Sequence, residues 1–119
     1  MSKGFCLLAQ NNSNTNYVRQ AYALALSLHL YNKDQKISLI TNDDVPTEWQ
    51  SVFDQIIPIP WDDSASKSNW KIENRWKVYN ATPYRNTIVF DVDMLVLENI
   101  DYIWKHYHDL VFTNSVKTY

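Results

Sequence analysis

Residues 87–97 have the sequence TIVFDVDMLVL, in which Asp91 and Asp93 interrupt an otherwise apolar run. Removing two like charges from water is unfavourable unless a cation or hydrogen-bond donors compensate, so the pattern predicts a positive charge at this place. Residues i and i+2 of an extended strand point to the same face, which would let both carboxylates reach one ion. Carboxylate oxygens are ligands that Mg²⁺ and Mn²⁺ prefer. The stretch therefore predicts a strand that delivers a divalent metal site.

The segments around this stretch alternate between strand and helix patterns, which favours an α/β fold. Strands are predicted at residues 4–10, 37–41, 55–59, 87–90 and 109–113. Helices are predicted at 17–31, 46–53, 70–81 and 102–106, and the polar stretch 61–69 is a loop that could cover a site. Pro58 and Pro60 indicate that the third strand lies at a sheet edge, because proline cannot donate to a ladder on both sides.

Successive strand, helix, strand units give parallel strands through right-handed crossovers. If the fourth strand packs beside the first, the sheet order is 3-2-1-4, and a topological switch point lies between these two strands. Ligands of open α/β sheets bind outside the carboxyl ends of the strands at such a point. The polar linker 11–16 and the carboxylates of Asp91 and Asp93 would then face each other across one crevice.

Length and composition limit the classes of protein to consider. The 119 residues are enough for a single domain, residues 1–119, and the net charge of -2 without a basic stripe disfavours nucleic acid as a partner. Cys6 is the single cysteine, so no intramolecular disulfide forms, and a small buried side chain is expected there. The apolar run 5–9 is too short for a signal peptide or a transmembrane segment. These features predict a cytoplasmic protein.

Gly4 is the single glycine of the chain. Phosphate-binding loops and dinucleotide fingerprints need several glycines for close backbone approach, so both are excluded. A phosphorylated ligand would instead need a metal held on carboxylates, together with basic side chains.

Several segments in order along the chain carry a resemblance. They are Gln10 at the end of the first strand, NTNY at 14–17, AYALALSL at 21–28, TPY at 82–84 and the motif stretch 87–97. This set resembles the GT-A-fold nucleotide-sugar glycosyltransferases, which include the glycogenin-like and bacterial galactosyltransferases. The resemblance implies a Rossmann-like three-layer sandwich with a mostly parallel sheet. It also implies transfer of a sugar from a nucleoside-diphosphate donor, with a UDP-sugar expected, to an acceptor that the sequence does not identify.

The resemblance also implies roles for particular residues. Asp93 would be the main ligand of Mn²⁺, or Mg²⁺, and Asp91 would reach both the metal and the ribose. The remaining implied contacts are to the base, from Ala9, Gln10, Asn14 and Tyr17, and to the diphosphate or donor sugar, from Arg75.

In the family, the acceptor pocket and a further metal-binding histidine follow the fifth strand. The resemblance therefore implies that these 119 residues correspond to a truncated GT-A unit, the donor-binding half. A non-catalytic nucleotide-binding module is accordingly the first alternative function.

A second alternative is a phosphatase of the haloacid-dehalogenase type. Residues 89–93, VFDVD, resemble its nucleophile strand, and residues 110–114, LVFTN, resemble its second motif. In that chemistry Asp91 would attack phosphorus and Asp93 would act as acid and base. Met94 and Leu95 stand where that motif has Gly-Thr, so this alternative ranks below the glycosyltransferase.

Simpler roles are open for the same residues. Tyr17 could pack under the sheet, the linker 11–16 could only cap a helix, and Arg75 could form an ion pair on a helix surface. His29 is expected on the surface of the first helix, and Asp43 and Asp44 in a turn.

Overall fold

A computed structural model of the chain describes residues 2–60 and 77–107. Its four strands form one parallel sheet in the order β3-β2-β1-β4. The strands are β1 (Lys3–Leu8), β2 (Ile37–Ile40), β3 (Gln55–Ile57) and β4 (Asn86–Phe90). The predicted α/β fold and strand order are confirmed, and β3 lies at an edge as the two prolines indicated.

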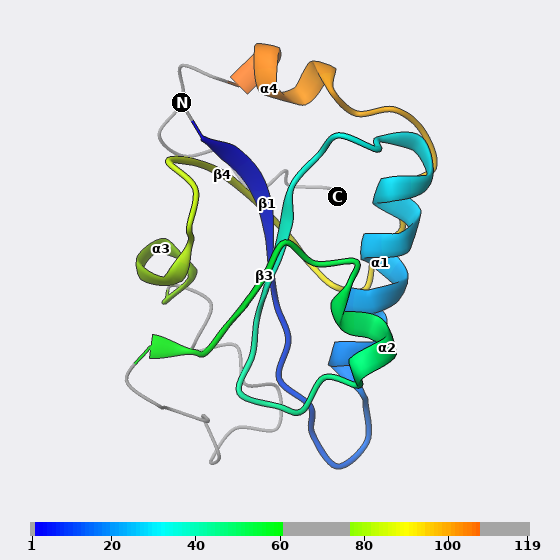
Figure 1. Cartoon of the computed structure of the whole chain (residues 1–119), viewed down its shortest axis with the longest axis vertical. Coiled ribbons are helices and arrows are strands. Elements are labelled where there is room, and N and C mark those ends of the chain that lie inside the picture. Colours follow the sequence, from blue (N-terminus) through cyan, green and yellow to red (C-terminus); the bar gives the residue numbers. More distant parts are fainter. Residues whose placement is uncertain (1, 61–76, 108–119) are drawn as a thin grey trace, which may run out of the picture.

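Helices cover both faces of this sheet. They are α1 (Tyr17–Tyr31), α2 (Thr47–Gln50), α3 (Val78–Ala81) and α4 (Tyr102–Tyr107). Helices α1 and α2 lie on one side of the strands and α3 lies on the other, which gives three layers (Figure 1). The first part of the helix predicted at 70–81 and the strand predicted at 109–113 lie outside the described residues.

Helix α1 has the bounds that its sequence predicts. Asn16 is the N-cap, and its Oδ1 accepts a hydrogen bond from the N–H of Arg19 at 3.0 Å. The buried residues recur at helical spacing, and they are Val18, Ala21, Leu24, Ala25 and Leu28. This stripe holds the helix on the sheet.

The larger core lies between α1 and the sheet. Its buried strand residues include Phe5 and Leu7 of β1 and Ile37 and Leu39 of β2. The ring of Phe5 stacks on Phe90 of β4 with centroids 4.8 Å apart. Alternate strand residues therefore point to the α1 side, as the period of a β-strand requires.

The opposite face of the sheet has a smaller core with buried polar groups. Tyr84 lies there, and its hydroxyl is 2.6 Å from Oγ of the fully buried Ser38. Cys6 is buried as predicted, and its Sγ–H donates to Oγ1 of Thr82 at 3.4 Å. Burial raises the pKa of the Cys6 thiol, and the hydrogen bond with Thr82 opposes that shift.

After β4 the chain returns along α1. We call residues 94–101 the return segment. The N–H of Val96 donates to Oγ of Ser27 at 2.8 Å. Oδ1 of the buried Asn32 accepts from the N–H of Ile100 at 2.8 Å, and its Nδ2 donates to the carbonyl oxygen of Glu98 at 3.0 Å. These bonds hold the return segment against the second half of α1.

Four predicted elements are shorter in the structure. Two of the differences are small, since β2 ends at Ile40 instead of Thr41 and β3 ends at Ile57 instead of Ile59. Helix α2 spans four residues instead of 46–53, and Pro46 is its N-cap instead of its first helical residue. The helix ends early because Asp54 joins β2. The N–H of Asp54 donates to the carbonyl oxygen of Ile37, and Oδ2 of Asp54 accepts from the N–H of Ile37, both at 2.8 Å. Strand β1 ends at Leu8 instead of Gln10.

His29, predicted on the surface of the first helix, is only partly exposed. This side chain is half-buried, and its Nε2 lies 2.9 Å from the carbonyl oxygen of Val52. The contact follows from the turn after α2, which brings Val52 against α1, and periodicity within α1 carries no information on that turn.

Candidate functional site

The register of the sheet brings the carboxyl ends of β1 and β4 together. The two strands are parallel neighbours, and Leu7 pairs with Phe90 at the end of the ladder. The loop that follows β1 and the acidic motif that follows β4 therefore start from adjacent strands. With β2 and β3 on the other side of β1, this place is a topological switch point of the sheet.

The acidic motif lies just beyond the strand instead of within it. Strand β4 ends at Phe90, Val92 and Asp93 form a turn, and both Asp91 and Asp93 are exposed. The prediction that these carboxylates are removed from water is therefore wrong, because both are exposed at the end of the sheet. The alternation of an extended strand also does not apply to this pair, since only residues up to Phe90 are in the ladder.

Two exposed carboxylates at this place still suit a hard divalent ion. Among residues 2–60 and 77–107, no group of three or more His, Cys, Asp or Glu side chains could hold a metal. Mg²⁺ in proteins is commonly held by one or two carboxylates together with substrate phosphates and water. Asp91 and Asp93 supply two carboxylates of this chemical kind.

The loop after β1 is ordered by its own asparagines. Oδ1 of Asn12 accepts from the N–H groups of Asn14 and Thr15, both at 2.8 Å. Oδ1 of Asn11 accepts from the N–H of Val18 at 3.0 Å, and Asn16 caps α1. The capping role that the sequence left open for this linker is confirmed.

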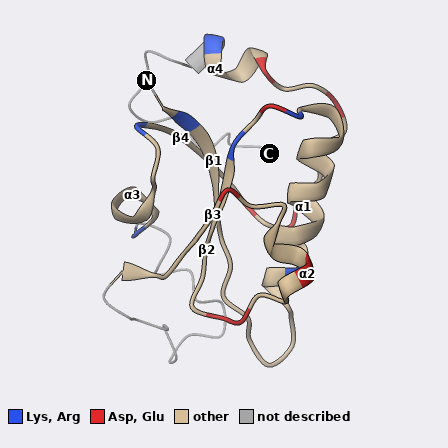
Figure 2. Ribbon diagram, viewed as in Figure 1, with Lys and Arg blue, Asp and Glu red and all other residues tan. Residues whose placement is uncertain are grey.

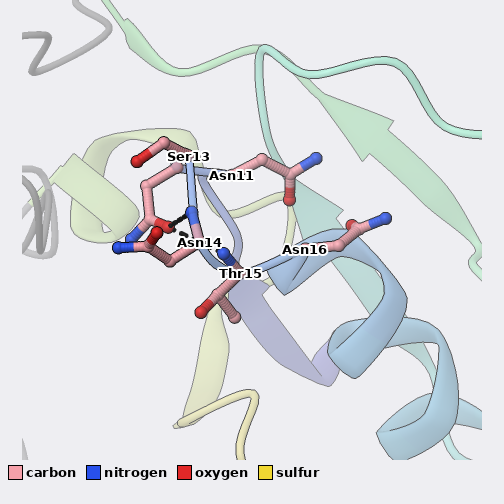
Figure 3. A pocket seen from close by; sticks show the side chains of 6 residues that line it. Asn11, Ser13, Asn14, Thr15 and Asn16 are labelled. Carbon is pink, nitrogen blue, oxygen red and sulfur yellow. Dashed lines mark hydrogen bonds between the residues drawn. The ribbon is translucent and has the colours of Figure 1, made fainter.

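Residues 11–16 also line an open polar hollow of about 280 Å³. Figure 3 shows its labelled side chains leaving one turn of the chain in different directions, without convergence on a common point. The hollow by itself therefore defines no ligand.

The remaining predicted nucleotide contacts fall in several environments. Ala9 and Gln10 are buried at the end of β1, Asn14 is exposed in the loop, and Tyr17 is half-buried and packs against the larger core. All four lie on the short path from β1 into α1. Arg75 lies outside the described residues.

A further residue at this end of the sheet did not emerge from the sequence pattern. Oδ2 of Asp43, in the loop between β2 and α2, accepts from the N–H of Asn11 at 2.7 Å. Asp43 was expected in a turn, and its own N–H does bond locally, to Oγ1 of Thr41 at 3.0 Å. Its bond to a second loop depends on the packing of β1 beside β2, which local sequence does not reveal.

Charge is dispersed over the described part of the chain. Figure 2 shows Lys and Arg on several separate elements, and acidic residues in the loop between β2 and α2 at the end of the molecule that also holds the loop between β1 and α1. In the same described part, no helix is long and apolar enough to cross a bilayer.

No family model matches the chain, and no curated protein matches it in sequence.

Proposed function

We propose that this chain is the nucleotide-sugar-binding domain of a metal-dependent glycosyltransferase of the GT-A type. The donor would be a nucleoside-diphosphate sugar, with a UDP-sugar as the first candidate. The family assignment rests on the ordered sequence resemblance, and the structure adds a geometric argument to it.

The observation that carries the proposal is the adjacency of β1 and β4. Strand order 3-2-1-4, with Leu7 beside Phe90, starts the loop after β1 and the Asp91–Asp93 turn from neighbouring strand ends. A nucleotide lying across this switch point would have its base near Ala9, Gln10, Asn14 and Tyr17. Its diphosphate would then lie toward the acidic turn.

Each part of the proposed site has a distinct task. Asp91 and Asp93 would hold Mn²⁺ or Mg²⁺, and Asp91 would also accept from a ribose hydroxyl. Arg75 would place a guanidinium beside the diphosphate, where its fork geometry suits phosphate oxygens. A bound divalent ion offsets the negative charge that develops on a departing diphosphate.

Two other functions use the same residues. A non-catalytic nucleotide-binding module would bind UDP and metal in the same way without sugar transfer. A phosphatase with Asp91 as nucleophile would instead hydrolyse phosphate monoesters, and neither the strand order nor the exposure of Asp91 separates it from the transferase. UDP titration and phosphatase assays distinguish the three functions.

The test is calorimetric titration of the purified chain with UDP, with and without Mn²⁺. We expect affinity to fall at least about tenfold without the metal, because two carboxylates facing a diphosphate repel it. Asp93→Asn should bind UDP equally weakly with and without Mn²⁺. The matched control is Asp44→Asn, which makes the same change at an exposed acid in the loop after β2 and should keep the metal dependence.

Equal UDP binding with and without Mn²⁺ by the folded wild-type chain would contradict the proposal. Hydrolysis of p-nitrophenyl phosphate that Asp91→Asn abolishes would replace it with the phosphatase. Metal-dependent UDP binding without hydrolysis or transfer of the sugar would favour the non-catalytic module.

A further inference from the structure

We infer that Asp43 is a positioning residue of the nucleotide site, which acts by fixing the peptide of Asn11. The inference rests on the proposed function, because it concerns the loop that would hold the base. Asp43 itself is assigned no contact with the ligand.

The first observation is the bond between two loops. Asp43 follows β2 and Asn11 follows β1, and the carboxylate oxygen of Asp43 lies 2.7 Å from the backbone nitrogen of Asn11. The carboxylate therefore holds the first peptide of the loop 11–16, directly after the buried Gln10.

The second observation is that Asp43 is itself held in place. Its N–H donates to Oγ1 of Thr41, which is buried at the end of β2. The neighbouring Asn42 accepts from the N–H of Ile59 at 2.8 Å, so the loop after β2 is also joined to the segment after β3. The acceptor for Asn11 is thus carried on a loop bound at two points.

The third observation is a hydrogen bond from α1 to the side chain of Asn11. Its Oδ1 accepts from the N–H of Val18 in the first turn of α1, at 3.0 Å. Fixing the Asn11 peptide therefore also fixes the start of the helix that carries Tyr17. Through Asn11, one carboxylate sets the position of the loop relative to α1, and with it the spacing of the predicted base contacts at Gln10, Asn14 and Tyr17.

A positioning role requires only a hydrogen-bond acceptor at position 43, whereas a direct electrostatic role requires the negative charge. Asn at position 43 retains a side-chain oxygen that can accept from Asn11, whereas Ala retains none. Asp43→Asn should therefore restore most of what Asp43→Ala loses. The matched control is Asp44→Ala, which removes an exposed carboxylate from the same loop.

The experiment has two readouts on the full chain. Amide hydrogen exchange of Asn11 and Val18 is measured without ligand, and UDP affinity is measured by titration with Mn²⁺ present. We expect Asp43→Ala to speed exchange at Asn11 by roughly tenfold and to weaken UDP binding by a similar factor. Asp43→Asn should lie close to wild type in both readouts, Asp44→Ala should match wild type, and circular dichroism should be unchanged in all three.

The outcomes separate this inference from the proposed function. If the wild-type chain binds UDP and Asp43→Ala binds it equally well, the positioning role is wrong while the function stands. If Asp43→Asn loses as much affinity as Asp43→Ala, the charge acts directly and the positioning role is also wrong. If the wild-type chain binds no UDP, the proposed function fails. The positioning of the loop then also fails if Asp43→Ala leaves amide exchange at Asn11 and Val18 unchanged.

Discussion

The two faces of the sheet are built from different chemistry, although the same strands supply both. On the α1 face, the buried side chains are almost all apolar, and Phe5, Leu7, Leu24 and Leu28 are inaccessible to water. On the α3 face, the described core is smaller and includes Ser38, Cys6 and Tyr84. One face thus relies on apolar burial and the other adds buried hydrogen bonds.

The difference follows from what each face has to hold. The α1 face packs a long helix, for which non-directional burial is sufficient. The α3 face holds the turn that leads into β4, where Oγ1 of Thr82 lies 2.7 Å from Oγ1 of Thr87 and accepts from the N–H of Tyr84 at 3.1 Å. Directional bonds fix a turn more closely than apolar contact does. Substitutions on the two faces should therefore lower the free energy of unfolding for different reasons.

The largest effect is expected on the α1 face. Leu24→Ala should lower the free energy of unfolding by about 2–5 kcal/mol, because it removes a fully buried side chain and leaves a cavity. Urea denaturation followed by circular dichroism measures the change. Leu26→Ala is the matched control on the same helix, since Leu26 is 44% exposed, and it should cost less than about 1 kcal/mol. Equal losses for the two variants would mean that burial on this face does not set stability.

An intermediate effect is expected on the α3 face, where Gly4 packs closely against the ring of Tyr84. A Cβ at position 4 would lie 2.6 Å from Cδ2 of Tyr84, well inside van der Waals contact. Gly4→Ala should therefore destabilise the chain by about 1–3 kcal/mol through overpacking. The same denaturation experiment in a Tyr84→Ala background tests the cause, because removing the ring should remove most of the penalty. An undiminished cost in that background would show that the Tyr84 ring is not the obstacle.

The smallest effect at neutral pH is expected for Tyr84→Phe. It removes the hydrogen bond to buried Ser38 and should cost about 1–2 kcal/mol.

This substitution also has a pH signature. Burial raises the pKa of Tyr84 above its ordinary 10.0, and the charges of Asp54 and Cys6 act in the same direction, while the bond to Ser38 opposes them. The unfolded chain then loses its proton first, so this contribution to stability is complete below about pH 10 and is lost as pH rises through the folded pKa.

Denaturation between pH 8 and 11.5 checks this point. Wild type should lose stability more steeply than Tyr84→Phe above pH 10. Parallel curves for the two would contradict the shift. Cys6 contributes a loss of the same sign from its ordinary 9.0 in both chains, and in wild type its charge also adds to the raised pKa of Tyr84.

Local patterns were sufficient for much of the fold. Helix α1 has its predicted bounds because Asn16 caps it and its apolar residues keep a helical period up to Leu28. The alternation of strands and helices predicted parallel strands, and Pro58 and Pro60 placed β3 at an edge. These signals come from residues close together in the sequence, and the tertiary contacts of the folded chain agree with them. The order 3-2-1-4 also required β4 to pack beside β1, as the structure shows.

The features that sequence did not give depend on contacts between distant segments. The exposure of Asp91 and Asp93 depends on where the β4 ladder ends, which its pairing with β1 decides. The bonds from Ser27 and Asn32 to the return segment join residues more than 60 positions apart. Asp43 was placed in a turn correctly, but its partner Asn11 lies on a separate loop. No periodicity within a segment contains this information.

Helix α1 sets the distance between the two parts of the proposed site, the loop after β1 and the segment that follows the acidic motif. Its first turn is bonded to the loop after β1, and its second half is bonded to the return segment that follows the acidic motif. Its 15 residues correspond to about 22 Å of helix. Adding or removing one residue would turn everything beyond it by about 100° and break the register of Ser27 and Asn32 with their partners. The length of this helix is therefore set by the contacts at both of its ends.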